Sequence, residues 1–261
     1  MTFANLPAML LAAGRGERMR PLTDTTPKPL LPVQGQPLLD WHMAALQRDG
    51  VRKVVVNTAW LGAQIPAHLN ARWPQQGMHL QYSHEQADFG HALETAGGIA
   101  RALPLLGEAF WLAAGDVFAP DFVFDAAAAQ AFVQSNDLAH VWLVPNPAHH
   151  VQGDFGLDES APGSCTGRAL NLPPADISRD ALPRWTYSTI ALLKAELLTA
   201  PWCELAAGNP TGVAAPLAPL LRRAMDAGRC GATLYTGRWT DVGTPERLAQ
   251  LNAAEVAAYK K

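Results

Sequence analysis

The stretch LLAAGRGERMRPLT at residues 10–23, followed by PKPL at residues 27–30, decides how this chain is interpreted. The apolar run Ala8–Ala13 predicts a buried strand, which ends in a turn where Gly14 and Gly16 let the backbone approach a ligand closely. The turn and the segment behind it carry four cations: Arg15, Arg18, Arg20 and Lys28. Clustered positive charge beside an open turn suits a polyphosphate, so this stretch predicts a site for a nucleoside triphosphate.

The spacing excludes the two common phosphate loops. A P-loop needs Gly, four residues and then Gly-Lys-Ser/Thr, and a dinucleotide fingerprint needs Gly-x-Gly-x-x-Gly. Here Met19 stands where the third glycine would be. The pattern Leu-Ala-Ala-Gly-x-Gly-x-Arg-Met-x-Pro-Leu-Thr, with Pro-Lys-Pro-Leu behind it, instead resembles the sugar-1-phosphate nucleotidylyltransferases, which couple a sugar 1-phosphate to a nucleoside triphosphate. The alternative is a surface turn that carries scattered arginines.

The resemblance assigns roles to individual residues of this loop. It implies that Arg18 holds the β- and γ-phosphates or stabilises the leaving group, and that Lys28 bridges the α-phosphate and the sugar phosphate. The other nucleotide-binding positions that it implies here are Leu11, Ala12, Ala13, Gly14, Gly16 and Glu17. Arg18 and Lys28 are therefore expected to be catalytic as well as nucleotide-binding.

Asp116 is the first candidate for a metal ligand. It follows the apolar run 110–114 and Gly115, and a carboxylate at the carboxyl end of a central strand faces the ligand crevice of α/β proteins. A nucleoside triphosphate site needs a divalent cation to neutralise phosphates, and Mg²⁺ prefers oxygen ligands with one or two carboxylates. Taken alone, the segment is equally compatible with a turn former or a helix cap at Asp116.

Asp241 is the second candidate. It lies in WTDVGT at residues 239–244, which resembles an element of the same family in which the aspartate joins the first carboxylate at the metal. The local alternative is a helix cap, although Thr244 is better placed for that role because Pro245 follows it. We therefore expect Asp116 and Asp241 to be catalytic residues that bind Mg²⁺ together.

The segment LETAGGI at residues 93–99 resembles the Glu-Thr-Gly-Gly-Gly or Gly-Thr-Ala-Gly element of the family. Small residues at a helix start let a base and ribose lie against backbone N–H and C=O groups. The resemblance implies nucleotide contacts from Thr95 and Gly97, and base contacts from Glu85 and Gly90 in the preceding segment. An ordinary glycine-containing helix start would give the same local pattern.

The sugar side is indicated by NPAHHVQGDF at residues 146–155. The pattern Asn-Pro-x-His-His-x-x-Gly-Asp-Phe resembles the branch of bacterial nucleotidylyltransferases that recycles cell-wall sugar as N-acetylmuramic acid 1-phosphate. Successive side chains of an extended segment point to opposite sides, so His149 and His150 are not expected to share one ion. The sugar-binding residues that the resemblance implies are Ala114, Asp154, Tyr187 and Ser188.

The resemblance therefore implies an enzyme that transfers a uridylyl group from UTP to N-acetylmuramic acid 1-phosphate and releases pyrophosphate. Three departures from the family pattern, Ala114 for an asparagine and Ala96 and Thr189 for glycines, leave other sugars open. The alternatives are a mannose- or heptose-1-phosphate guanylyltransferase, a glucose-1-phosphate thymidylyltransferase, and a non-catalytic regulatory domain that binds nucleotide sugars. Retention of Arg18, Lys28 and both aspartates disfavours the regulatory domain.

Strand-like runs alternate with helix-like stretches along the chain, as in a largely parallel sheet with helices on both faces. We expect an α/β, Rossmann-like nucleotide-diphospho-sugar transferase fold, with a single domain over residues 1–261. After the first strand, the patterns predict a helix at 37–49 and strands at 53–57, 80–82, 110–113, 140–144 and 187–192. The segment 146–183 is rich in Pro, Gly and Asp, which favours hairpins and loops over the sheet rather than core.

Charge and hydropathy limit the partners of the chain. The formal net charge is −3, and the sequence holds no polybasic tract. No apolar run reaches the roughly 20 residues of a membrane span, and residues 1–5 lack the charged start of a signal peptide. We therefore expect a cytoplasmic protein without a nucleic-acid or membrane partner, either a monomer or a small homo-oligomer.

Overall fold

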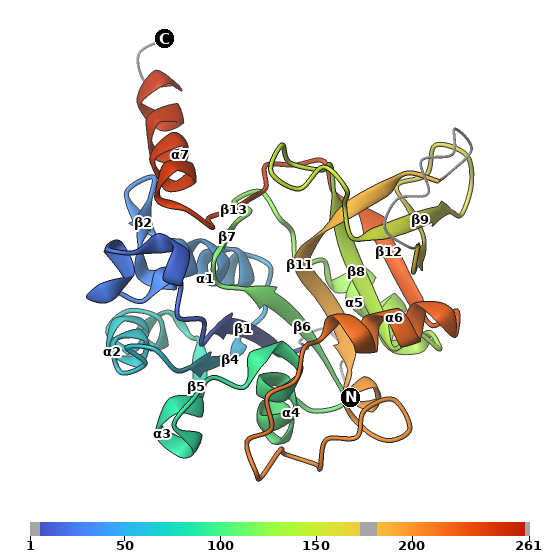
Figure 1. Cartoon of the computed structure of the whole chain (residues 1–261), viewed down its shortest axis with the longest axis horizontal. Coiled ribbons are helices and arrows are strands. Elements are labelled where there is room, and N and C mark those ends of the chain that lie inside the picture. The colour runs from blue at the N-terminus through green and yellow to red at the C-terminus, as the bar shows by residue number, and fades with distance from the viewer. Residues whose placement is uncertain (1–5, 173–181, 259–261) are drawn as a thin grey trace.

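The order of the strands places β1, which leads into the glycine loop, beside β6, which leads into Asp116. The computed structural model describes residues 6–172 and 182–258 (Figure 1). Within these residues nine strands form one sheet in the order β5-β4-β1-β6-β11-β8-β12-β10-β9. Their bounds are β1 Ala8–Ala12, β4 Lys53–Thr58, β5 His79–His84, β6 Ala109–Ala114, β8 Ala139–Val144, β9 Phe155–Glu159, β10 Thr166–Leu170, β11 Arg184–Lys194 and β12 Cys230–Leu234.

Most of the strands described in this sheet point in the same direction. β1 is parallel to β4 and β6, β4 is parallel to β5, and β12 is parallel to β8. By contrast, β11 and β10 run antiparallel to each of their neighbours. The expected mixed, mostly parallel sheet is therefore confirmed, and the strands predicted from apolar runs coincide with β1, β4, β5, β6, β8 and β11.

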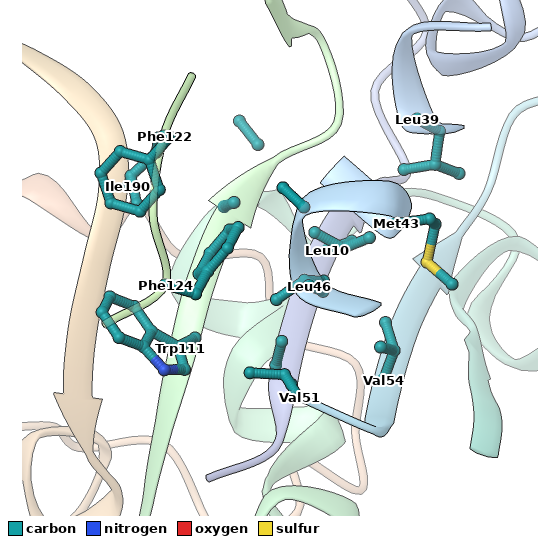
Figure 2. Packing of buried hydrophobic residues seen from close by; sticks show 14 of the residues in the cluster. Leu10, Leu39, Met43, Leu46, Val51, Val54, Trp111, Phe122, Phe124 and Ile190 are labelled. Carbon is teal, nitrogen blue, oxygen red and sulfur yellow. The ribbon is translucent and has the colours of Figure 1, made fainter. Parts of the chain in front are cut away.

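Helices cover both faces of the sheet. Alternate residues of a strand point to opposite faces, so Leu10 of β1 packs in one apolar cluster and Met9 in another. The cluster around Leu10 includes residues of α1, α2 and α5, and Figure 2 shows Leu39 and Met43 of α1 within it. The cluster around Met9 includes residues of α4 and α6. The helix bounds are α1 Leu38–Arg48, α2 Gln64–Asn70, α3 Glu85–Phe89, α4 Glu94–Leu106, α5 Ala126–Gln134, α6 Ala218–Asp226 and α7 Pro245–Ala258.

The segment after Asn146 differs from the expectation of loops lying over the sheet. β9 and β10 do form a hairpin, but this hairpin extends the sheet, because β10 pairs with β12 and β9 pairs with the start of β11. Phe155, Leu157 and Ala169 are buried in the cluster around Met9. The two strands are short and separated by turn residues, so their alternation of apolar and polar side chains is too brief to recognise. Residues 173–181 of this segment lie outside the described residues, as do residues 1–5, on which the signal-peptide argument rests.

Helix α7, near the C-terminal end of the described chain, packs against a segment near its N-terminal end. It contacts β2 (Pro32–Val33), a short strand that pairs with β3 (Gln36–Pro37) (Figure 1). Leu248 of α7 packs with Met19 behind the glycine loop in a third apolar cluster. Thr244 Oγ1 accepts a hydrogen bond from the Arg247 N–H at 3.4 Å and so forms the expected N-cap. Among the helices described, none has the length and apolarity required to cross a membrane.

Candidate active site

A cavity of about 590 Å³ opens where β1 and β6 end, beside Tyr187 and Thr189 of β11 and between the glycine loop and helices α4 and α6. One set of lining residues, here called the β1 wall, is Leu11, Ala12, Ala13, Gly14, Asn57, Ala92, Glu94 and Thr95. A second set, the α6 wall, is Leu112, Tyr187, Thr189, Pro216, Leu217, Ala218 and Leu221. Lys28, Pro29, Ala114 and Asp116 complete the lining. The cavity thus brings together the N-terminal loop, the first carboxylate and the helix start that the sequence indicated separately.

The β1 wall is supported by a buried polar chain. The Ala12 N–H donates to Asn57 Oδ1 at 2.7 Å, and Asn57 Nδ2 donates to Glu85 Oε1 at 2.7 Å. The Leu93 N–H donates to Glu85 Oε2 at 2.7 Å. These bonds tie the strand before the glycine loop to the segment before α4, and they satisfy polar groups that would otherwise be costly to bury.

Glu85 therefore has a different place from the one expected. Its side chain is fully buried, both of its carboxylate oxygens accept hydrogen bonds from the chain itself, and it does not line the cavity. Burial raises the pKa of this carboxyl, while the Leu93 N–H and Asn57 lower it. The structure gives Glu85 the role of a support for Asn57 and Leu93, and its expected base contact stays a prediction.

Backbone N–H groups at the start of α4 donate hydrogen bonds to another segment of the chain. The N–H groups of Ala96 and Gly97 donate to Ala215 O at 2.8 and 3.1 Å. A Cβ added at Gly97 would lie 2.4 Å from Val213 O, so only glycine allows this close packing. Gly97 is thus a packing position, and its expected nucleotide contact stays a prediction, whereas Thr95 does line the cavity.

Gly90 lies outside the cavity lining as well. It ends α3 with a φ of 78°, and its N–H donates to Gln86 O at 2.9 Å. Its carbonyl accepts a hydrogen bond from Gln86 Nε2 at 2.8 Å. The glycine therefore serves the helix end, where a left-handed residue is needed, and its expected base contact stays a prediction.

Ser188 and Thr189 form a bulge in β11 beside the α6 wall. The register of β11 against β8 shifts between Tyr187 and Ala191, and Thr189 has a φ of 62°, which is unfavourable for a β-branched residue. The Ser188 side chain is buried and accepts the Ile190 N–H at 3.1 Å, so it supports the bulge instead of facing the cavity as expected. The side of the bulge that faces the cavity is Thr189.

Tyr187 and Asp154 are linked to each other. The ring of Tyr187 lines the cavity, but its hydroxyl is enclosed and makes no hydrogen bond within the described ranges; burial raises its pKa. Asp154 Oδ2 accepts the Tyr187 N–H at 2.8 Å, and its Oδ1 lies 3.1 Å from His150 Nε2. The carboxylate expected to hold a sugar hydroxyl is therefore engaged in fixing β11, and it does not line the cavity.

Lys28 and Asp116 meet inside the cavity. Lys28 Nζ lies 2.5 Å from Asp116 Oδ2, and the Lys28 residue is only 8% exposed. Gly16 permits this arrangement, because its φ is 65° and a Cβ added there would lie only 3.2 Å from Lys28 Cβ. A buried lysine on a carboxylate at the cavity floor is positioned to pair with phosphate.

The other cations of the loop do not all face the cavity. Arg15 and Arg20 both pair with Asp24, at 3.2 and 2.9 Å, and the Arg15 guanidinium lies over the Trp60 ring at 3.6 Å. The expectation that all four cations serve a polyphosphate is therefore corrected for these two. Their role here is to fix the loop.

Arg18 and Glu17 lie in a short 3₁₀ turn at residues 17–19 and are exposed. Neither lines the cavity, and Arg18 makes no ion pair with any other residue of the described segments. Their expected contacts with nucleotide remain predictions.

Asp241 does not line the cavity, but the strand that carries it lies beside the residue that follows Asp116. β13 (Thr240–Asp241) pairs with β7 (Val117–Phe118), with Asp241 opposite Val117, and the Val242 N–H donates to Asp116 O at 3.0 Å. Asp241 Oδ2 accepts a hydrogen bond from Arg247 Nη1. Its Oδ1 lies 2.8 Å from His149 Nε2 but outside hydrogen-bonding geometry, so this buried oxygen accepts no hydrogen bond in the described part of the chain.

His42 supports the turn that carries Asp116 through a hydrogen bond to the backbone of the next residue. Its Nε2 lies 2.9 Å from Val117 O, and the residue is buried. Burial lowers the pKa of this imidazole, while its hydrogen bond to Val117 and the charge of Asp116 raise it. A neutral His42 that donates to the backbone after Asp116 holds the turn on which that carboxylate sits.

The two carboxylates suit a divalent cation with oxygen ligands. The described residues contain no group of three or more His, Cys, Asp or Glu side chains that could form a metal cage. Asp116 in the turn before β7 and Asp241 on β13 supply oxygen donors, and one Asp241 oxygen is buried without a hydrogen bond. Mg²⁺ is commonly held by one or two carboxylates together with substrate phosphates, so this donor set fits it.

Several residues of the site are not identified by the sequence analysis. Asn57 ends a buried strand with a polar residue, the same signal that identified Asp116, and it could have been found in that way. Arg247 and His149 become neighbours of Asp241 only through the packing of α7 and of the loop after β8. His149 and His150 point to different aspartates, as expected for successive side chains.

The fold and the motifs agree with what is known of similar proteins. A model of the nucleotidyl transferase family matches residues 7–159. The chain is 43% identical over 250 residues to an N-acetylmuramate alpha-1-phosphate uridylyltransferase of Neisseria meningitidis, a match that covers 95% of this chain and 97% of that protein. The chain belongs to the nucleotidyl transferase family.

Two further proteins resemble this nucleotidyltransferase. An N-acetylmuramate alpha-1-phosphate uridylyltransferase of Caulobacter vibrioides is 45% identical over 103 residues, which are 39% of this chain and 41% of that one. A Bacillus anthracis protein assigned as a glucose-1-phosphate thymidylyltransferase has a crystal structure that matches with a TM-score of 0.72 at 17% identity, covering 95% of this chain and 94% of that chain. The second likeness concerns the fold alone and confirms the expected Rossmann-like architecture. As a nucleotidyltransferase, the chain is an enzyme, which sets aside the regulatory-domain alternative.

Proposed function

We propose that this enzyme transfers the uridylyl group of UTP to N-acetylmuramate 1-phosphate. A phosphate oxygen of the sugar attacks the α-phosphorus of UTP, the bond to the β-phosphate oxygen breaks, and pyrophosphate leaves with that electron pair. The observation that carries the transfer reaction is the contact of Lys28 Nζ with Asp116 Oδ2 at 2.5 Å in the cavity beside the glycine loop. The choice of substrates is supported by the similarity to the Neisseria protein along nearly the whole chain.

The chemistry requires two anions to be brought together. Lys28 would hold the α-phosphate and the sugar phosphate at the floor of the cavity, so its charge acts where the two repel each other. Backbone N–H groups from Gly14 to Glu17 and the exposed Arg18 would hold the β- and γ-phosphates. Mg²⁺ on Asp116 and Asp241 would neutralise charge on the reacting phosphates. No general base is needed, because a phosphate monoester is largely ionised at neutral pH.

The two walls divide the remaining work. The β1 wall offers small residues and backbone, which suits a flat base and ribose, while the α6 wall offers aliphatic side chains that suit the sugar and its substituents. The proposal also places the reaction in the cytoplasm.

The test is a pyrophosphate-release assay with Mg²⁺. It crosses UTP, GTP, dTTP and CTP with the 1-phosphates of N-acetylmuramate, N-acetylglucosamine, glucose, mannose and heptose, and product is identified by mass. Release with UTP and N-acetylmuramate 1-phosphate at the highest kcat/KM supports the proposal. Preference for another pair overturns the substrate assignment. Asp116→Asn serves as the background control, since loss of one of the two carboxylates removes the metal site.

A further inference from the structure

Both carboxylates proposed to bind metal are paired with a cation of the chain. Lys28 Nζ lies on Asp116 Oδ2, and Arg247 Nη1 donates to Asp241 Oδ2. Arg247 Nη1 also donates to Asp241 O at 3.1 Å and lies 3.1 Å from His149 Nε2. Arg247 Nη1 therefore contacts both the side chain and the backbone of Asp241, and the His149 imidazole lies beside both Arg247 Nη1 and Asp241 Oδ1.

The position of Arg247 is unfavourable for the helix that carries it. It lies in the first turn of α7, where Thr244 is the N-cap, and a cation there faces the positive end of the helix dipole. Its side chain is 16% exposed, compared with 62% for Arg238, whose partner Asp121 lies on the surface. A partly desolvated cation at a helix start needs a nearby anion, and Asp241 is that anion.

We propose that Arg247, backed by His149, holds Asp241 in the metal-free enzyme and is displaced when a divalent cation binds. The proposal rests on the proposed metal role of Asp241. Arg247 is thus a positioning residue: it keeps the carboxylate in place beside Asp116 and prevents an unpaired buried charge. Its displacement adds a free guanidinium to the site only once metal has arrived, when negatively charged phosphates are present to accept it.

The physical basis is competition between charges of the same sign. A guanidinium within hydrogen-bond distance of Asp241 repels an arriving cation and occupies one oxygen that the cation would use. Removing this positive charge leaves Asp241 free, so metal should bind more tightly although the site loses a contact. A purely structural role of Arg247 predicts the opposite, because a displaced Asp241 would bind metal more weakly.

The experiment measures Mn²⁺ binding by electron paramagnetic resonance, in the absence of any nucleotide or sugar. The free aqueous Mn²⁺ signal is followed during titration of the full-length wild type, Arg247→Gln, Arg247→Lys and the matched surface control Arg238→Gln. We expect Arg247→Gln to lower the Kd for Mn²⁺ about tenfold, a change typical of one nearby charge. Arg247→Lys, which keeps the charge but not the fork of donors, should lie between it and the wild type, and Arg238→Gln should match the wild type.

Unchanged or weaker Mn²⁺ binding in Arg247→Gln would overturn the proposal, and so would an absence of binding in every variant. If Arg247→Gln does not fold by circular dichroism, His149→Gln replaces it and should shift the Kd in the same direction by a smaller factor. Failure here is distinct from failure of the proposed function. Wild-type formation of the uridylylated sugar with unchanged Mn²⁺ affinity in the variants would remove only the role of Arg247.

Discussion

The two walls of the cavity are built in different ways. The β1 wall consists mostly of small side chains and backbone held by the buried bonds of Asn57 and Glu85, whereas the α6 wall consists mostly of aliphatic side chains, with Tyr187 and the bulge at Thr189. The backbone of the first wall changes little when its side chains change, so it can serve any enzyme that binds a nucleotide. The second wall depends on the size of its side chains, such as Leu221, and is suited to distinguish one sugar from another. The difference separates binding of the nucleotide, which the β1 wall would provide, from discrimination among sugars, which the α6 wall would provide.

Lys28 belongs to neither wall, and its substitution tests whether the reacting phosphates meet between the two walls. We expect Lys28→Ala to lower kcat about 10²–10³-fold, because a charge aimed at the reacting phosphates is lost. Binding of UTP should weaken much less, since the β1 wall and the loop remain. Steady-state kinetics together with nucleotide titration measure the two effects. Equal losses in kcat and in UTP binding would contradict the role between the walls.

Leu221→Ala tests whether the α6 wall reads the sugar. Leu221 is buried in the core cluster and lines the cavity, so its truncation should cost about 2–4 kcal/mol of unfolding free energy and raise the KM for sugar 1-phosphate. The KM for UTP should stay the same. Leu220→Ala is the matched control, because Leu220 is buried in the same cluster but does not line the cavity. A sugar KM that rises equally in both variants would mean that the effect is only loss of packing. Urea unfolding and two-substrate kinetics provide the measurements.

Glu85→Gln tests whether Glu85 supports the β1 wall, through the pH dependence of the unfolding free energy. Burial raises the pKa of Glu85 from 4.5, so the folded protein holds its proton at pH values where the unfolded chain has released it. The corresponding contribution to stability is complete below pH 4.5 and is lost as pH rises through the folded pKa. The wild type should therefore show a decline in unfolding free energy in this window that Glu85→Gln lacks. Denaturant unfolding from about pH 4 to about pH 8 measures the slopes, and parallel curves for the two proteins would refute the assignment.

Thr189→Gly is expected to have the smallest effect on stability. The φ of 62° is strained for threonine but not for glycine, and relief of about 1 kcal/mol offsets the lost side-chain contacts and the greater freedom of the unfolded chain. The unfolding free energy should stay within about 1 kcal/mol of the wild type, while selectivity among sugar 1-phosphates decreases. Thr189→Ser, which keeps the strain, is the control. Unaltered sugar selectivity in the glycine variant would show that Thr189 does not define the α6 wall.

Local sequence patterns predicted the central strands well, because each of these strands is a continuous apolar run in the sequence. The buried strand before Gly14 and the strand that leads into Asp116 are continuous apolar runs, which are favoured wherever a strand is covered on both faces. The hairpin of β9 and β10 was expected, but its place in the sheet was missed, because its burial depends on pairing with β11 and β12, strands that are distant in sequence. The same limit applies to Glu85 and Asp154, whose carboxylates looked available until the backbone groups that they accept from were placed beside them.

The sequence by itself determined the family pattern, the glycine loop, Lys28 and the two candidate carboxylates, because these depend on residue type and spacing along the chain. Only the tertiary structure decided which polar groups remain free for a ligand. Whether a side chain such as Glu85 is free to bind a ligand depends on the hydrogen-bond donors that pack against it. These donors can come from residues far apart in the sequence, such as Asn57. The contact of Asp241 with His149 is of this kind, since it arises where the loop after β8 meets β13.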